Sequence, residues 1–142
     1  MDKYNKSLDL VMLVDDDDTT NYLNERLLKD MQVAEQIVVL KNGREAIDYL
    51  KAATNGTEGL KSPDLIFLDI KMPVMDGFSF LDEYHKEGLD DSDQVIILML
   101  TSSASFYDLE RLRNYKKVKK HYSKALTKHD VREIMNEYFA TR

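Results

Sequence analysis

The chain has 142 residues, the size of one ordinary domain, which leaves no room for two catalytic domains. Apolar residues make up 43% of it and charged residues 32%, as in globular proteins, and the lack of cysteine excludes disulfides and thiolate metal sites. The net charge of −6 combines an acidic region, residues 1–110 at −13, with a basic one, residues 111–142 at +7. A nucleic-acid-binding role would rest on the basic region alone, because the acidic one repels phosphates.

The sequence also lacks the features of a membrane or secreted protein. Its longest apolar runs, such as residues 95–100, are far too short to cross a bilayer. Residues 1–7 have no apolar core of the kind found in secretory signals. We therefore expect a soluble cytoplasmic domain that does not contact the membrane.

Short apolar segments alternate with amphipathic segments along the chain. The apolar segments are continuous, which indicates strands buried on both faces of a sheet. This alternation predicts an α/β fold in which helices cover both faces of a parallel sheet. In chain order, the predicted elements are strand Leu8–Val14, helix 19–30, strand Ala34–Leu40, a helix capped by Asn42, strand 64–68, helix 78–86, strand 94–100, helix 105–114, strand 118–122 and helix 127–138.

Two helices and one loop carry specific expectations. The first helix should be capped by Asp18 or Thr19, and the last one by Thr127. Residues 53–62 form a loop that is longer than most connections in compact domains. In the first helix, the apolar side chains at helical spacing, which we expect to face the core, are Tyr22, Leu23, Leu27 and Met31.

Polar residues lie just past the ends of four of the predicted strands. They are the aspartates 15–18, Asp69, Thr101 and Lys124. In parallel sheets of this kind, ligands bind beyond the carboxyl ends of the strands. Clustered carboxylates need a cation, most plausibly Mg²⁺, while an amine and a hydroxyl suit a phosphoryl group. A carboxylate among them can act as a nucleophile and form an acyl phosphate, so the strand ends predict aspartyl-phosphate chemistry.

The same residues belong to a recognisable set of motifs. The most specific one is Asp69-Ile70-Lys71-Met72-Pro73 followed by Asp76-Gly77, and it is accompanied by Val14-Asp15-Asp16, Leu100-Thr101-Ser102-Ser103 and Lys124. Together they resemble the response-regulator receiver domain of two-component signalling, over residues 8–139. The resemblance implies a flavodoxin-like, doubly wound sheet of five parallel strands in the order 2-1-3-4-5. It implies a receiver domain at residues 8–140, a tail at residues 1–7 and no output domain.

The resemblance assigns a role to each site residue. It implies that Asp69 accepts the phosphoryl group, that Asp16, Asp69 and the Lys71 backbone carbonyl bind Mg²⁺, or Mn²⁺ in its place, and that Asp15 binds the ion through water. Asp17 is an additional acid in this cluster. The phosphate-binding residues would be Thr101 and Lys124, and the side chains that tune hydrolysis Lys71 and Ser103.

The resemblance also implies partners and an output. A histidine kinase or histidine phosphotransfer protein would supply the phosphoryl group, and the domain would catalyse its own phosphotransfer and slow autodephosphorylation. Phosphorylation would then switch a protein-docking surface between Ser105 and Tyr138, without direct DNA binding. Residues 111–128 within it contain eight Lys or Arg and no acid, so this surface suits an acidic partner.

Two positions depart from the family pattern. Ala125 follows the active-site lysine where the family usually has a proline after a cis peptide bond. Since a cis bond before a residue other than proline costs about 2.5–4 kcal/mol, we expect a trans bond and a remodelled loop. His121 occupies the usual position of a switch aromatic residue, and the adjacent Tyr122 should face the opposite side of the strand. Either His121 or Tyr122 would have to act in the switch.

Two other interpretations remain open. Asp15-x-Asp17-x-Thr19 also satisfies the signature of haloacid-dehalogenase-type Mg²⁺ phosphatases, in which Asp15 would be the nucleophile. That family requires a further acidic pair after a later strand, which the sequence does not offer, and leaves the segment from Asp69 to Gly77 unexplained. Alternatively, the chain is a degenerate receiver that binds a partner independently of phosphorylation.

Overall fold

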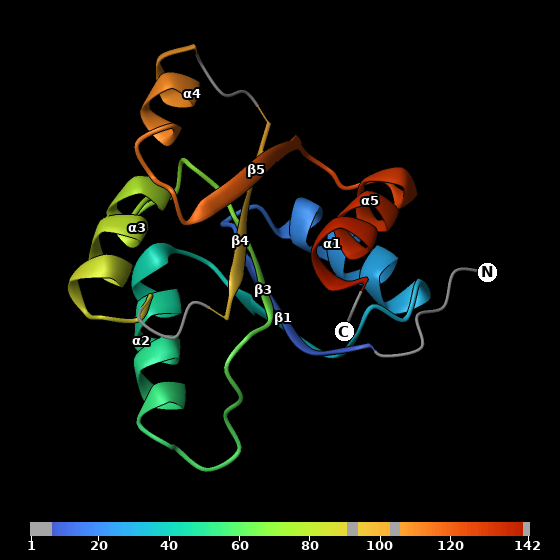
Figure 1. Cartoon of the computed structure of the whole chain (residues 1–142), viewed down its shortest axis with the longest axis horizontal. Helices are drawn as coiled ribbons and strands as arrows, with labels where there is room; N and C mark the ends of the chain where they lie inside the picture. The colour runs from blue at the N-terminus through green and yellow to red at the C-terminus, as the bar shows by residue number, and fades with distance from the viewer. Residues whose placement is uncertain (1–6, 91–93, 103–105, 141–142) are drawn as a thin grey trace.

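A computed structural model describes residues 7–90, 94–102 and 106–140 of the chain. Its strands are all parallel and form a single five-stranded sheet, shown in Figure 1. Their bounds agree with the predicted strands to within two residues. The central strands are short apolar runs with clear ends, whereas the last strand is mostly polar and exposed. The strands are β1 (Leu8–Val14), β2 (Ala34–Leu40), β3 (Leu65–Leu68), β4 (Ile96–Thr101) and β5 (Val118–Ser123).

Five helices connect and follow the strands. Asn42 and Thr127 cap their helices as predicted, since their side chains accept hydrogen bonds from the backbone N–H groups of Glu45 and Asp130. The second helix extends to Thr54, two residues into the predicted loop. The helices are α1 (Asp18–Asp30), α2 (Gly43–Thr54), α3 (Gly77–Lys86), α4 (Phe106–Leu112) and α5 (Lys128–Phe139).

The strand order is β2-β1-β3-β4-β5, which confirms the doubly wound topology. Helices α1 and α5 cover one face of the sheet, and α2, α3 and α4 cover the other (Figure 1). Each face has its own buried apolar cluster, and both clusters draw on the continuous apolar strands β1, β3 and β4. Within the described ranges, no helix combines the length and the hydrophobicity needed to cross a membrane.

The order of the strands brings the predicted site together. The chain reverses its direction of winding between β1 and β3, which are adjacent central strands, so their carboxyl ends form a crevice. Val14 at the end of β1 pairs with Leu68 at the end of β3, and Asp15 and Asp69 follow these two residues directly. The acids therefore lie side by side although they are 54 positions apart in the sequence.

The prediction for the buried face of α1 is wrong in part. Met31 is buried, but Tyr22 and Leu23 are 60% and 48% exposed. The helix instead buries Asn21 and Asn24, whose side chains hydrogen-bond to backbone groups outside the helix. A buried polar side chain is tolerated when its hydrogen bonds are made within the protein, so apolar spacing alone does not identify this face.

The ends of α1 and α4 differ from the predicted ones. The N-cap of α1 is Asp17 rather than Asp18 or Thr19, because the helix begins one residue earlier than expected. Helix α4 starts at Phe106 and ends at Leu112, two residues short of the predicted end. The predicted cap of α4, Ser105, lies outside the described residues.

Candidate functional site

Three carboxylates meet at the carboxyl ends of β1 and β3. Asp15, Asp16 and Asp69 each offer one carboxylate oxygen, and these three oxygens all lie within 4.8 Å of one another. Asp15 and Asp69 are buried, whereas Asp16 is exposed and reaches the group from the solvent side. These three acids are the ones that the resemblance assigns to the metal site, Asp16 and Asp69 as direct ligands and Asp15 through water.

Asp69 is held in a defined orientation. Its Oδ1 accepts a hydrogen bond from the backbone N–H of Ile70 at 2.9 Å, and its Oδ2 lies 3.2 Å from Nζ of Lys124. Burial, and after it the nearby Asp15 carboxylate, raise the pKa of Asp69 to about 6, although Lys124 acts in the opposite direction. Asp69 is therefore a buried carboxylate next to a second acid, and one of its oxygens faces the Lys124 ammonium.

Lys124 joins the two buried acids. Its Nζ lies 2.8 Å from Asp15 Oδ2 as well as 3.2 Å from Asp69 Oδ2, and its side chain is only 11% exposed. Burial works against the charged ammonium, but the hydrogen bond and charges of Asp15 and Asp69 outweigh it and raise the pKa of Lys124. The lysine points into the site, unlike the exposed basic residues around it in the sequence.

The peptide bond after Lys124 is cis, so the expectation of a trans bond at Ala125 is wrong. Hydrogen bonds to residues far away in the sequence hold the chain on both sides of this bond. Such bonds cannot be predicted from the local sequence. The backbone N–H of Lys124 donates to the carbonyl of Thr101 at 3.1 Å, and that of Leu126 donates to Oδ1 of Asn24 at 3.0 Å.

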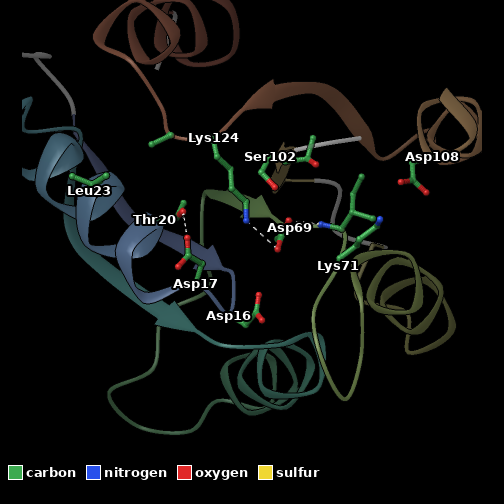
Figure 2. A pocket seen from close by; sticks show the side chains of 12 residues that line it. Asp16, Asp17, Thr20, Leu23, Asp69, Lys71, Ser102, Asp108 and Lys124 are labelled. Carbon is green, nitrogen blue, oxygen red and sulfur yellow. Dashed lines mark hydrogen bonds and ion pairs between the residues drawn. The ribbon is translucent and has the colours of Figure 1, made fainter. Parts of the chain in front are cut away.

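The additional acid of the cluster, Asp17, faces the first helix. Its Oδ2 accepts a hydrogen bond from the Thr20 hydroxyl at 2.5 Å, and this bond lowers the pKa of Asp17. Its backbone N–H donates to Asp15 Oδ1 at 2.9 Å. Figure 2 shows Asp17 and Thr20 together to one side, while Lys124 reaches Asp69 from above and Asp16 lies below it.

An open cavity of about 430 Å³ lies above Asp69. Thr101 at the end of β4 lines it and is buried, while Lys71 is exposed on its rim. The predicted residue Ser103 lies outside the described residues. The cavity has room for a small charged group at Asp69, and its lining residues are Asp16, Asp17, Thr20, Leu23, Asp69, Ile70, Lys71, Thr101, Ser102, Asp108, Lys124 and Ala125.

Asp76 and Gly77 place the start of α3 against the backbone of Asp69 and Ile70. Asp76 caps α3 by accepting a hydrogen bond from the Ser79 N–H at 2.8 Å, and the Gly77 N–H donates to the carbonyl of Ile70 at 2.8 Å. A Cβ atom on Gly77 would lie 2.4 Å from the carbonyl oxygen of Asp69. Glycine is thus required where the start of α3 meets the backbone of the acceptor residue.

The donor set fits a hard divalent cation. The three acids offer only oxygen ligands and carry three formal charges, which the single ammonium of Lys124 cannot balance. Mg²⁺ and Mn²⁺ prefer such oxygen ligands, and Mg²⁺ typically takes one or two carboxylates together with water and phosphate oxygens. The residues present therefore suit the ion that the sequence analysis predicted.

The two candidate switch residues lie on opposite sides of β5, as expected. His121 is exposed, whereas Tyr122 is buried in the cluster under α1 and α5. The Tyr122 hydroxyl donates to Oε1 of Glu133 in α5 at 2.8 Å, and Lys120 contacts the same carboxylate. The large aromatic residue at this end of β5 thus packs against α5 rather than α4.

Sequence reasoning missed two residues next to the site. Asn21 and Asn24 lie on the buried face of α1 and hydrogen-bond to the backbone at Asp15 and Leu126. The sequence feature that could have identified them is a pair of asparagines three positions apart, in the helix that follows the acidic cluster.

Comparison with known proteins gives a consistent result. The family model of the response regulator receiver domain matches residues 11–136. A protein-glutamate methylesterase/protein-glutamine glutaminase of Desulfotalea psychrophila is 35% identical over 102 residues, which are 72% of this chain and 26% of that protein. This chain covers less than two thirds of the first three curated relatives, namely 26%, 63% and 9% of their lengths.

Solved structures agree. A two component response regulator from Cytophaga hutchinsonii superposes with a TM-score of 0.84 at 26% identity, over 95% of this chain and 99% of that one. The Mn²⁺-bound form of response regulator Rcp1 shares the fold, with a TM-score of 0.73 at 23% identity over 94% and 96% of the two chains. With the family model covering most of its length, the chain belongs to the response regulator receiver domains of two-component signalling.

Proposed function

We propose that this receiver domain accepts a phosphoryl group on Asp69 from the phosphohistidine of a histidine kinase or a histidine phosphotransfer protein. The observation that carries the proposal is the position of Asp69 at the end of β3. It lies among Asp15, Asp16 and Lys124, beneath an open cavity. Receiver domains of this kind are phosphorylated by histidine kinases, which fits this arrangement.

The transfer is a nucleophilic displacement at phosphorus. A carboxylate oxygen of Asp69 forms the new P–O bond, and the P–N bond of the donor breaks, with its electron pair going to the leaving imidazole. Lys124 pairs with the incoming phosphoryl oxygens, and the Thr101 hydroxyl donates a hydrogen bond to one of them. Both groups supply positive charge or donors where the phosphoryl group places negative charge.

The metal-binding residues in this proposal are Asp16, Asp69 and the backbone carbonyl of Lys71, with Asp15 acting through water. A bound Mg²⁺ supplies the charge neutralisation that lets an anionic donor approach clustered carboxylates. The exposed Lys71 side chain on the rim and Ser103 are proposed to control the access of the water that later hydrolyses the acyl phosphate.

The proposed output surface covers α4, β5 and α5, between Ser105 and Tyr138. Phosphorylation adds about 1.5 to 2 negative charges near Thr101, at the end of β4 and beside β5. Much of the basic side-chain surface is exposed there, which suits an acidic protein partner whose binding weakens with salt. Some of this charge is already paired, since Arg113 contacts Glu110 and Lys120 contacts Glu133.

Intact-mass measurement after incubation with acetyl phosphate and Mg²⁺, and then with histidine kinases, tests the proposal. The expected result is one added phosphoryl group in the wild type and in Asp15→Asn at a reduced rate, and none in Asp69→Asn. Labelling lost only in Asp15→Asn would instead support the phosphatase interpretation. No Mg²⁺-dependent labelling with any donor would support the degenerate receiver.

A further inference from the structure

The face of α1 that packs on the sheet is polar at its centre. Asn21 and Asn24 are 5% and 1% exposed, positions where a helix covering a sheet normally places apolar side chains. They are three residues apart and lie one above the other on the same side of the helix. Both are adjacent to the space between Asp15 and Asp69.

Asn24 holds the loop that carries the lysine. Its Oδ1 accepts a hydrogen bond from the backbone N–H of Leu126 at 3.0 Å, across 102 positions of sequence. At the other end of this loop, the backbone N–H of Lys124 donates to the carbonyl of Thr101 at 3.1 Å. The segment 124–126 is therefore fixed at both ends, and from it Nζ of Lys124 reaches Asp15 and Asp69.

Asn21 holds the loop that carries the acids. Its Nδ2 donates to the backbone carbonyl of Asp15 at 2.8 Å in the buried part of the site. Helix α1 thus contacts both loops through one asparagine each, the acidic loop through Asn21 and the lysine loop through Asn24. Neither asparagine lines the open cavity, so both contact the site from its buried side.

We propose that Asn24 is a positioning residue, which sets the distance of the Lys124 ammonium from Asp69 and so the affinity of the site for a phosphoryl group. This inference rests on the proposed function, in which Lys124 pairs with phosphoryl oxygens. The Leu126 N–H is buried, and without Asn24 it has no acceptor at that position, so the lysine loop shifts. The metal-binding acids are held separately and stay in place.

The test compares two affinities in the full chain. Beryllofluoride, a phosphoryl analogue that needs the metal, is titrated at saturating Mg²⁺ by calorimetry, and Mg²⁺ is titrated alone. Asn24→Leu removes the acceptor while keeping the branched shape of the side chain, and Asn24→Ala removes it without added apolar bulk in case the first variant does not fold. Leu28→Val, one turn further along the same buried face, is the matched control for lost stability.

We expect Asn24→Ala to weaken beryllofluoride binding about 10- to 100-fold, the loss of one charge-assisted contact, with Mg²⁺ affinity unchanged. Leu28→Val should lower the urea midpoint and change neither affinity. Asn24→Asp, which keeps an acceptor oxygen, should restore most of the beryllofluoride affinity. In a Lys124→Met background, Asn24→Ala should cause no further loss, because both changes act through the same ammonium.

Other results would overturn the proposal. Unchanged beryllofluoride binding in Asn24→Ala, full additivity with Lys124→Met, or equal losses of both affinities would show that Asn24 does not act through Lys124. If the wild type itself binds no beryllofluoride with Mg²⁺, the proposed function fails and this inference fails with it. Normal wild-type binding with an unaffected Asn24→Ala would reject the positioning role alone.

Discussion

At the scale of single residues, the close contact at Gly77 is a requirement of the site. Replacing this glycine by alanine puts a Cβ atom 2.4 Å from the Asp69 carbonyl oxygen and 3.1 Å from Cα of Ile70. Both neighbours are backbone atoms, so the end of β3 or the start of α3 must move.

We therefore expect Gly77→Ala to lower the free energy of unfolding by about 1–3 kcal/mol, as overpacking usually does. Urea unfolding measures this loss. Ser79→Ala, at an exposed position in the same helical turn, is the control and should stay close to wild type. A Gly77→Ala variant as stable as the control would contradict the described contact.

The buried charge of Asp69 makes stability depend on pH when no divalent cation is bound. Burial and the Asp15 carboxylate raise the pKa of Asp69 to about 6 from its ordinary value of 3.8. Above pH 6 the carboxylate is charged in the folded and unfolded chain alike, and its burial costs stability. As the pH falls toward 4, the folded chain takes up the proton first, and this cost disappears.

Asp69→Asn removes the charge at every pH. In a chelating buffer we expect it to be more stable than wild type by about 1–2 kcal/mol near neutral pH, a value reduced for solvent screening. The difference should shrink as the pH approaches about 4. Urea titrations of both proteins across this range provide the measurement, and a constant difference would rule out a perturbed Asp69.

At the scale of elements, polar side chains of β5 meet α5 at the carboxylate of Glu133. The Tyr122 hydroxyl donates to Glu133 at 2.8 Å, and Lys120 contacts the same Glu133 oxygen. Desolvation and this acidic neighbour raise the pKa of Tyr122, so the hydroxyl stays protonated and remains a donor.

Tyr122→Phe keeps the buried ring and removes only the hydroxyl. We expect it to cost about 1 kcal/mol of stability, the usual value of one hydrogen bond, in chemical denaturation. Glu133→Gln keeps an acceptor for the hydroxyl and should cost less in the same assay. Equal stability of Tyr122→Phe and wild type would show that the hydroxyl does not join the two elements.

The elements also show what sequence can and cannot predict. The central strands β1, β3 and β4 were predictable because they are continuous apolar runs, whereas β5 is mostly polar and gave a weaker signal. The acids at the strand ends followed from the rule for parallel sheets. The exposed Tyr22 and buried Asn24 of α1 were not predictable, since the hydrogen bond that permits burial joins α1 to a loop 102 positions away. The cis bond after Lys124 escaped prediction because local propensity favours trans.

At the scale of the whole molecule, metal binding should be linked to folding. Residues 15, 16 and 69 come together only when β1 and β3 pair, so the unfolded chain lacks the site. A ligand that binds only the folded state stabilises it, by about 2.7 kcal/mol at a concentration 100 times Kd.

We accordingly expect Mg²⁺ to raise the thermal midpoint of the wild type in a concentration-dependent manner, and to have a much smaller effect on Asp16→Asn. Thermal unfolding with and without a chelator measures the shift. Ca²⁺-free NaCl at matched ionic strength is the control for simple screening. A thermal midpoint that does not change with Mg²⁺ would show that the ion does not bind at these three acids.

At this scale, the proposed function requires that separate strand ends build one phosphoryl-accepting site around Asp69. A crystal structure with Mg²⁺ and beryllofluoride tests it most directly. We expect the ion on Asp16 and Asp69, the beryllofluoride on the Asp69 carboxylate, and Thr101 and Lys124 in contact with its fluorines. Beryllofluoride bound at Asp15 instead, or an ion away from the three acids, would contradict it.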